Sequence, residues 1–446
     1  MKQILLVMLS FSIAVLAAQS APFYPTTTLV ENFGASWCAA CNVAQQGLDV
    51  IESEVHAGEI IIPRLLTESG EYSFAEMDER FDYYEVLGFP AVFFNGKIRV
   101  DGSDDLVADG SLYRTALNQF RYLASPLKMT VENANHSTGN YAFKVTMMHP
   151  EQSIEAGNVM FYLVEDNVAD GITRLVRNVQ SQAIALSGQG NFQTFNFSVS
   201  PNPAWNSANL WALAFVQVPA KTVIQAVSTL PVPEQQIRVA VPFDRNLTET
   251  EPLTLFSPFF YVHNLGPAGT FITSIEIHSA PATWFLNYCD EDGACLPGGL
   301  QVPHAVDANG FKTFDLNVVA DSEGLAVFDF VIQKEGSETY RIPFSLRVGN
   351  VSNADPISAP ASISVRSAWP NPFQNTLSFE LQSAKTGLNS NLKIYNSRGQ
   401  IVSTVPLINL QQGSSQVNWD ASELPAGVYF YRLENAKQTG KILKLR

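Results

Sequence analysis

The sequence predicts a multidomain fold in which an N-terminal α/β domain is followed by β-sandwich domains. Its 446 residues correspond to about three domains at roughly 150 residues each. Hydrophobic residues make up 46% and charged residues only 15%, while Phe (29), Gly (27) and Pro (25) are abundant, which favours β-rich modules over a disordered chain. Strand-like and helix-like segments alternate up to residue 125, and only strand-like runs follow.

Charge and histidine distribution exclude two classes of partner. The net charge is −15, from 27 basic and 42 acidic residues, and phosphate binding needs a positive surface, so we expect no nucleic-acid partner. The six histidines are scattered along the chain without the spacing of metal ligands. We therefore expect no metal site and no cofactor.

Residues 1–20 are predicted to be a cleaved signal peptide. Lys2 precedes an apolar run over residues 4–18, and small residues follow at 17–21. A run of about 15 apolar residues is short for a membrane span. No later run reaches the length of a span, so we expect no transmembrane span in the mature protein. Export leads to an oxidising compartment, where the four cysteines can form two disulfides.

Residues 22–125 alternate between the two periodicities. Apolar alternation predicts strands over 28–33 and 59–66, and Asn95-Gly96 predicts a tight hairpin between strands 91–94 and 97–100. A period near 3.6 predicts helices. The predicted helices cover residues 39–54, 74–86 and 107–123.

Beyond residue 125 the sequence predicts three further modules. Short β-type runs separated by turn clusters indicate β-sandwich domains over 126–235 and 236–366, with a linker near 231–235. A last module covers 369–446. No fixed-period repeat is evident.

The most specific motif is Trp37-Cys-Ala-Ala-Cys41, which follows a predicted strand and begins a predicted helix. In this βα context C-x-x-C indicates redox chemistry. Two intervening residues on a first helical turn bring both sulfurs within disulfide reach, and the helix N-terminus stabilises a thiolate at Cys38. Cys38 is therefore the expected nucleophile and Cys41 the resolving thiol. A zinc half-site would need further ligands, and a purely structural disulfide stays as an alternative.

A second motif, Gly88-Phe-Pro-Ala-Val-Phe-Phe-Asn-Gly96, lies about 50 residues further on. Together the two motifs closely resemble the thioredoxin fold over about 100 residues. The resemblance implies a thioredoxin-like domain over 22–125, in which Pro90 is a cis-proline facing the cysteine pair. It also implies that Trp37, Phe89 and Pro90 line the groove for protein disulfide or thiol substrates.

The chain departs from the thioredoxin pattern in two places. Asn32 stands where thioredoxins often carry a buried acid, six residues before the first cysteine, and an amide cannot accept the proton of the resolving thiol. The neighbouring Glu31 points to the opposite face by strand alternation. Ala39-Ala40 replaces the familiar Gly-Pro, so the reduction potential of the family does not carry over.

The region after the thioredoxin-like segment resembles the β-domain that follows a thioredoxin fold in a family of outer-membrane-associated proteins of Gram-negative bacteria. The strand-like runs around 159–164, 211–217 and 223–226 carry this resemblance, which brings no assigned chemistry. An acidic pair and two arginines could form a binding cluster, but a solvated surface network is the favoured interpretation. These residues are Glu165, Asp166, Arg174 and Arg177.

Cys289 and Cys295 enclose five residues that include Asp292-Gly293, a turn signal. This spacing predicts a structural disulfide that closes a turn, because no strand–helix context is present. The acidic run 290–292 could hold Ca²⁺, but it lacks the spacing of a calcium loop.

Residues 369–446 contain Trp369-Pro-Asn-Pro-Phe, a strand pattern at 392–402, Trp419-Asp, Leu424-Pro-Ala-Gly and a basic closing strand. The ordered set closely resembles the C-terminal sorting domain of the type IX (Por) secretion system; an ordinary Ig-like terminal domain is the alternative. The tail has 8 Lys and Arg against 4 Asp and Glu, in contrast to the acidic chain as a whole. The resemblance implies passage through the periplasm of a Gram-negative bacterium, contact with the type IX machinery, and release or attachment at the cell surface, outside the outer membrane.

Two functions follow from these patterns. The first is a secreted or cell-surface thiol–disulfide oxidoreductase that uses Cys38 and Cys41. The second is a non-catalytic adhesion or binding protein on a thioredoxin-like and Ig-like scaffold. The cysteine motif favours the oxidoreductase. Asn32 and the large share of the chain in β modules favour the binding protein.

Overall fold

The computed structural model describes most of the mature chain. The described ranges are 21–67, 72–103, 108–168, 172–200, 202–233, 236–349, 363–383, 386–396, 401–433 and 439–445. The predicted signal peptide, residues 1–20, lies outside the described residues, as do residues 234 and 235 of the predicted linker. No described helix is both long and apolar enough to cross a membrane.

The N-terminal region contains three helices and short strands around a central strand. They are β1 (Tyr24–Pro25), β2 (Thr28–Gly34), α1 (Ala39–Ser53), β3 (Ile60–Ile61), β4 (Arg64–Leu66), α2 (Ala75–Tyr84), β5 (Ala91–Phe94), β6 (Ile98–Asp101), α3 (Ser111–Phe120) and β7 (Ala124–Ser125). The strand predicted over 59–66 is split, because Pro63 has no N–H to continue the ladder. The helix predicted over 107–123 begins only at Ser111, after Gly110 with a φ of 73°.

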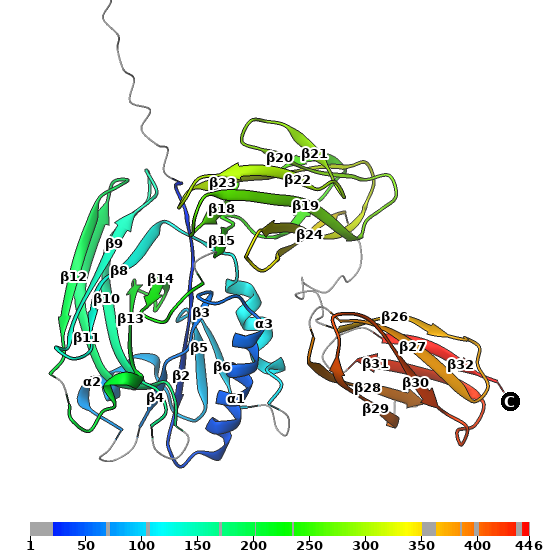
Figure 1. The fold of residues 1–446 in the computed structure, drawn as a ribbon, viewed down its shortest axis with the longest axis horizontal. Helices are drawn as coiled ribbons and strands as arrows, with labels where there is room; N and C mark the ends of the chain where they lie inside the picture. The colour runs from blue at the N-terminus through cyan, green and yellow to red at the C-terminus, as the bar shows by residue number, and fades with distance from the viewer. Residues whose placement is uncertain are drawn as a thin grey trace, which may run out of the picture.

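The strands follow the order β4-β2-β5-β6, with β4 parallel to β2 and with β5 antiparallel to both β2 and β6. α1 and α3 lie side by side on one face, where Leu48 and Leu117 share a core with Val92 (Figure 1). α2 covers the other face through Met77 and Phe81. β2 is buried along its whole length, so its two faces are enclosed by different layers.

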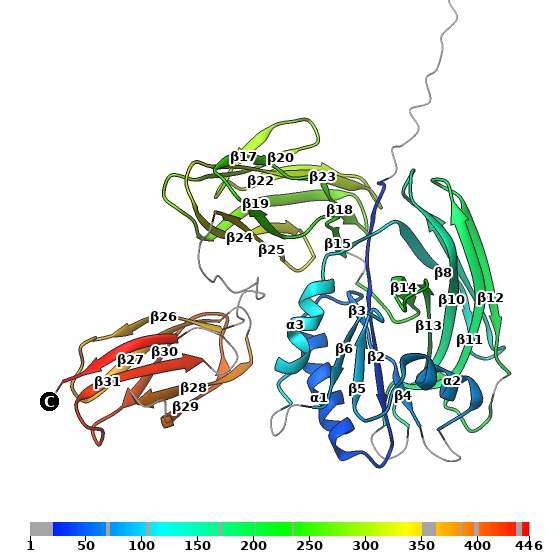
Figure 2. The ribbon, with the colours of Figure 1, turned by 180° about the vertical axis from the view of Figure 1, so that it is seen from behind.

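The middle region extends this sheet. Its strands are β8 (Leu127–Asn135), β9 (Asn140–Met147), β10 (Ser153–Glu165), β11 (Leu175–Ser187), β12 (Phe192–Ser198), β13 (Leu210–Gln217) and β14 (Val223–Ser228). Leu175 of β11 lies opposite Arg64 of β4 in a parallel pair, and the backbone N–H of Arg64 donates to the carbonyl of Arg174 at 2.7 Å. The sheet therefore runs without a break as β14-β13-β10-β11-β4-β2-β5-β6 (Figure 2).

This continuity differs from the expectation of separate modules on the two sides of residue 125. Side chains of α2 and β2 share one core with Tyr162, Val176 and Phe215 of the middle region. A second sheet, β12-β9-β8, packs on the far side of β10 and β13 around Phe143 and Phe161. The middle region is thus a sandwich, one sheet of which is shared with the N-terminal region.

The third region consists of two sheets that enclose one core. Its strands are β15 (Ile237–Ala240), β16 (Asn246–Glu249), β17 (Leu253–Phe256), β18 (Phe260–Asn264), β19 (Gly269–Ser279), β20 (Phe285–Asp290), β21 (Cys295–Pro297), β22 (Val302–Val306), β23 (Phe311–Ala320), β24 (Gly324–Lys334) and β25 (Tyr340–Val348). β15, β17, β18, β20, β21 and β23 form one sheet and the others form the second. Arg238 joins this region to the first, because it donates to the carbonyls of Thr26 and Gly58.

The C-terminal region is a smaller pair of sheets with its own core. Its strands are β26 (Ile363–Trp369), β27 (Thr376–Ser383), β28 (Leu388–Asn396), β29 (Ile401–Leu410), β30 (Gly413–Asp420), β31 (Gly427–Leu433) and β32 (Thr439–Lys444). They form the sheets β26-β27-β30 and β29-β28-β31-β32. Phe379, Trp419 and Leu433 lie in the core between them.

Candidate functional site

The N-terminus of α1 carries the first disulfide. β2 ends at Gly34, and Cys38 is the N-cap of α1, with its sulfur accepting a hydrogen bond from the N–H of Cys41 at 3.1 Å. Cys38 and Cys41 form a disulfide with a Cα–Cα distance of 5.3 Å. The unpaired N–H groups of a helix N-terminus favour negative charge. When the disulfide is opened, this position therefore stabilises a thiolate.

The two cysteines differ in accessibility. Cys38 is 8% exposed and Cys41 1% exposed, so an incoming group reaches Cys38 first. Gly34 makes room for the inner sulfur, because a Cβ at this position would lie 3.0 Å from Cys41 Sγ. This difference fits the roles that the sequence predicts for the two thiols, with Cys38 outside and Cys41 inside.

An aromatic rim surrounds the disulfide. The Phe89 ring packs against Cys38 and Cys41 and lies edge-on to the Trp37 ring, with 6.2 Å between centroids. Trp37 is 71% exposed, Pro90 is buried, and the Phe89–Pro90 peptide bond is cis. The structure thus brings Trp37, Phe89 and the cysteine pair together. Leu87, 95% exposed on the same loop, was not singled out from the sequence, where an isolated leucine carries no signal of exposure.

Asn32 and Glu31 lie on opposite faces of β2, which confirms the prediction from strand alternation. Asn32 faces α1, where its Nδ2 donates to Gln45 Oε1 at 2.9 Å, and Gln45 in turn donates to Asp49. Glu31 faces α2 and the middle region. In the described part of the chain, the side chain that hydrogen-bonds to Asn32 is thus the amide of Gln45 and not a carboxylate.

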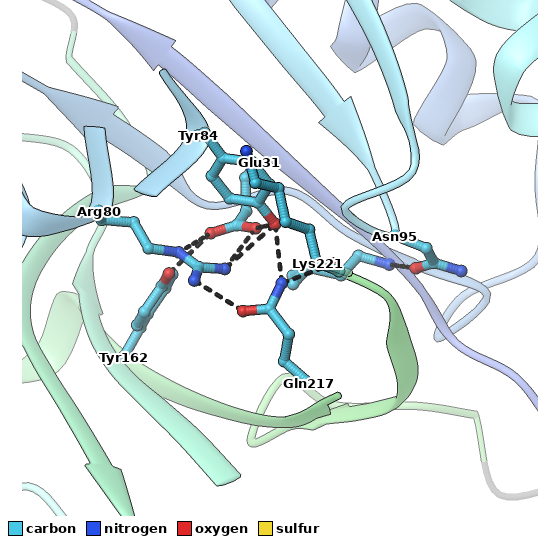
Figure 3. A network of polar contacts seen from close by, with 8 residues as sticks. Glu31, Arg80, Tyr84, Asn95, Tyr162, Gln217 and Lys221 are labelled. Carbon is cyan, nitrogen blue, oxygen red and sulfur yellow. Dashed lines mark hydrogen bonds and ion pairs between the residues drawn. The ribbon is translucent and has the colours of Figure 1, made fainter. Parts of the chain in front are cut away.

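Glu31 belongs to a fully buried network (Figure 3). Arg80 donates to both of its carboxylate oxygens, at 2.9 and 2.8 Å, while Tyr84 and Tyr162 donate at 2.8 and 2.7 Å. Burial alone would lower the pKa of Arg80, but the charge and hydrogen bonds of Glu31, together with Tyr162 and Tyr84, outweigh burial and the pKa is raised. Gln217 accepts from Arg80. The network ties β2 to the middle region and lies on the face away from the cysteines.

Arg64 lies on the cysteine side, and the sequence analysis did not single it out. It is 2% exposed at the start of β4, opposite Asn32 in register, and its Nη2 donates to Asn42 Oδ1 at 2.9 Å. Its Nε is buried without a hydrogen-bond partner. Burial lowers its pKa, which the charge of Asp49 partly offsets. The only sign of a buried arginine in the sequence was its position within the apolar run Ile60–Leu66.

The expectation of a solvated network for Glu165 and Arg177 is wrong. Arg177 Nε donates to Glu165 Oε2 at 2.7 Å, and the side chains of the arginine and the carboxylate are 12% and 5% exposed. The other carboxylate oxygen of Glu165 accepts from the N–H of Asn206 at 2.7 Å. Arg174 contacts α1 instead, with ion pairs to Asp49 at 3.0 Å and Glu52 at 2.5 Å. Glu165 and Arg177 thus form a buried pair within the middle region, whereas Arg174 connects that region to α1 through partly exposed carboxylates.

The second disulfide, Cys289–Cys295, joins directly opposite residues of the antiparallel strands β20 and β21. Asp290 Oδ1 accepts from the N–H groups of Asp292 and Ala294, so this carboxylate holds the turn. Glu291 pairs with Lys312. No group of three or more His, Cys, Asp or Glu side chains suited to a metal ion occurs in the described ranges.

Two solved structures that are similar to this chain have low scores. Dimeric latent PorU from Porphyromonas gingivalis is 14% identical with a TM-score of 0.19, covering 72% of this chain and 34% of that one. A tetra-tandem repeat in the extending region of a large adhesion protein is 12% identical with a TM-score of 0.14, covering 72% of each chain. This chain thus spans about a third of the length of PorU. Scores this low support no conclusion about fold or function.

No curated protein matches the sequence. One family model does, and it covers residues 367–445, the C-terminal pair of sheets, with the description secretion system C-terminal sorting domain. The matched segment runs from the end of β26 through β32 and includes most of the core around Trp419. The protein is therefore exported by the type IX secretion system of a Gram-negative bacterium and is secreted or held at the cell surface.

Proposed function

We propose that the exported protein is a thiol–disulfide oxidoreductase that acts through Cys38 and Cys41. The observation that carries this proposal is the disulfide at the N-cap of a long helix, with one sulfur more accessible than the other and an exposed tryptophan beside it. A helix N-terminus lowers the pKa of a cysteine, and thiolates are the reactive form. A cysteine pair that serves only packing needs neither a helix N-terminus nor an accessible sulfur.

We also propose that residues 22–125 are a thioredoxin-like domain. The order β4-β2-β5-β6 supports it, because a βαβ unit and a ββα unit share one sheet, with α1 and α3 on one face and α2 on the other. The cysteine pair then lies at the carboxyl end of the central strand β2. In this setting Phe89 and Trp37 form the surface that a protein substrate contacts.

In the proposed reaction, the Cys38–Cys41 disulfide oxidises a substrate dithiol. A thiolate of a substrate dithiol attacks Cys38 Sγ, the Cys38–Cys41 bond breaks, and Cys41 leaves as a thiolate that takes up a proton. The second substrate thiolate then attacks the substrate sulfur of the mixed disulfide and releases Cys38. Two electrons pass from the substrate dithiol to the cysteine pair, and the reverse sequence reduces a substrate disulfide.

Oxidation and isomerisation of reduced or scrambled ribonuclease, together with insulin reduction, test the proposal. We expect Cys38→Ser to lower exchange to the uncatalysed rate and Cys41→Ser to accumulate mixed disulfides. The matched control removes the other pair, Cys289→Ser with Cys295→Ser, and should retain activity. Equal rates for wild type and Cys38→Ser would refute the proposal.

One observation favours the second candidate, a non-catalytic surface-binding role. The amide of Asn32 donates to Gln45 and cannot act as a base for the resolving thiol. A binding protein would keep an unreactive Cys38–Cys41 bond in a glutathione buffer. It would also bind its surface target equally well after Cys38→Ser.

A further inference from the structure

The strand register places Arg64 close to the inner cysteine. In the parallel pairing of β2 with β4, Asn32 lies opposite Arg64, and Gly34 lies opposite Leu66. A Cβ on Gly34 would lie 3.0 Å from Cys41 Sγ and 3.5 Å from Leu66 Cδ2, so the sulfur rests on the Gly34–Leu66 row. Residues two apart on a strand share a face and are separated by about 7 Å. On the face of the sheet that α1 covers, the Asn32–Arg64 pair is thus the neighbour of the Gly34–Leu66 pair.

A hydrogen bond fixes the guanidinium on this side of the sheet. Arg64 Nη2 donates to the side chain of Asn42, the residue that follows Cys41 in the first turn of α1. Arg64 is 2% exposed, so water does not screen its charge. Arginine keeps its proton at such sites.

The charge of Arg64 has no carboxylate partner within ion-pair distance in the described part of the chain. From α1, the groups that face it are the amides of Asn42 and Gln45 and the carboxylate of Asp49, which pairs with Arg174. From β2 it faces the neutral Asn32. Glu52 on α1 also pairs with Arg174.

The buried carboxylates of Glu31 and Glu165 each have an arginine partner. Glu31 lies on the opposite face of β2, paired with Arg80, and Glu165 pairs with Arg177. Ala35 and Phe89, which lie in one apolar cluster with the two cysteines, carry no charge. Asp49 and Glu52 share one counter-ion, Arg174, and the charge of Asp49 also acts on Arg64. Both carboxylates lie at least eight residues, about 12 Å, further along α1 than Cys41, so Arg64 is the one of these charges that lies nearest to the buried end of the cysteine pair.

We propose that Arg64 is a positioning residue that stabilises the thiolate of the reduced Cys38–Cys41 pair by its buried charge. This inference rests on the proposed oxidoreductase function. A carboxylate at position 32 would cancel the field of Arg64, whereas the amide of Asn32 preserves it. A stabilised thiolate favours the reduced form, so the disulfide becomes a stronger oxidant.

The test compares Arg64→Gln with wild type in the full mature chain. The pH dependence of alkylation gives the thiol pKa, and equilibration with glutathione gives the reduction potential, with peptide mass spectrometry separating this pair from Cys289–Cys295. Removal of an opposite charge should raise the lowest thiol pKa of the pair by about one unit. We expect the equilibrium to shift about tenfold toward the disulfide, about 30 mV more negative.

Two variants serve as controls. Arg64→Lys retains the charge and should restore values close to wild type. Arg238→Gln removes another buried arginine that donates only to Thr26, Thr27 and Gly58 in the described structure, near the start of β2, and should change neither value. An unchanged thiol pKa in folded Arg64→Gln, or equal losses in Arg64→Gln and Arg64→Lys, would overturn the inference. Both readouts use chemically reduced protein, so they remain informative if no catalysed exchange is found and the proposed function fails.

Discussion

At the scale of single residues, two neighbours on β2 divide the molecule into two electrostatic environments. Glu31 is completely buried, and its charge is balanced by Arg80 and two tyrosine hydroxyls. Asn32, one position on, faces the helix of the cysteines with no charge of its own. Strand alternation alone made this division predictable. The partners of Glu31 were not, because Arg80 and Tyr162 come from segments 49 and 131 residues away.

Glu31→Gln should destabilise the protein by about 3–5 kcal/mol, because it leaves the buried Arg80 charge without its counter-ion. Urea unfolding of the purified protein measures this loss. The control is Glu85→Gln, whose carboxylate is 80% exposed and pairs with Lys221 at 3.3 Å; we expect less than about 1 kcal/mol there. Equal unfolding midpoints for the two variants would contradict the assignment of Glu31 to a buried pair.

The buried ring of His263, which hydrogen-bonds to the Phe23 carbonyl, should make the stability of the protein sensitive to acid. Burial lowers its pKa to about 3, although its bond to the Phe23 carbonyl opposes the shift. The unfolded chain therefore binds one more proton than the folded chain between about pH 6.5 and pH 3. The stability that the neutral ring contributes is complete above pH 6.5 and is lost as pH falls through this window, by about 1.4 kcal/mol per pH unit.

The measurement for His263 is denaturant unfolding at pH 7 and pH 5 for wild type and His263→Gln. Other groups titrate equally in both proteins, so the difference between their pH slopes isolates this ring. The variant should lose less stability than wild type between the two pH values. Parallel slopes would show that His263 is not buried as a neutral ring.

At the scale of elements, the hairpin 91–101 was predictable except for its register, because Phe94 pairs with Ile98 and β6 begins one residue later than the predicted strand 97–100. Asn95-Gly96 specifies a turn with positive φ at both positions. The observed φ values are 46° and 67°. Helix α1 was equally clear from its periodicity. The split of the predicted strand 59–66 also has a local cause, Pro63. The pairing of β4 with β11 has no local signal, because one register pair joins segments more than 100 residues apart.

Gly96→Ala should cost about 2 kcal/mol or more. A side chain at a φ of 67° costs about 1 kcal/mol, and its Cβ would lie 1.8 Å from the carbonyl oxygen of Lys221. The control, Gly102→Ala, has a φ of 88° but nothing within 4 Å of the added Cβ. Thermal unfolding should therefore separate the two variants. If they prove equally stable, the close approach of the turn to Lys221 is incorrect.

At the scale of the whole molecule, the sequence predicted the sorting domain correctly, because the motifs that mark it are local patterns. It did not foresee that the N-terminal and middle regions share one sheet and one core. That sharing depends on matched apolar faces, such as Phe81 against Phe215 in the same cluster. Periodicity shows that a face is apolar, but it does not show which partner covers it.

Removal of residues 367–446 should abolish export beyond the periplasm without altering the stability of the rest. The match to the sorting domain covers this segment, and the cores of the three preceding regions contain no residue beyond 348. Cell fractionation and thermal unfolding of the truncated protein measure the two effects. Surface display of the truncated chain would contradict the role of the domain, and a large drop in melting temperature would contradict its structural independence.

The shared sheet has a consequence for the order in which the chain matures. A polypeptide crosses the inner membrane from its N-terminus, so the cysteine motif emerges long before β11 and β13. Until those strands arrive, β4 has an open edge and the apolar face of α2 lacks its cover, a combination that favours aggregation. The segment with the cysteine pair is therefore among the first to reach the periplasm and among the last to acquire its finished environment.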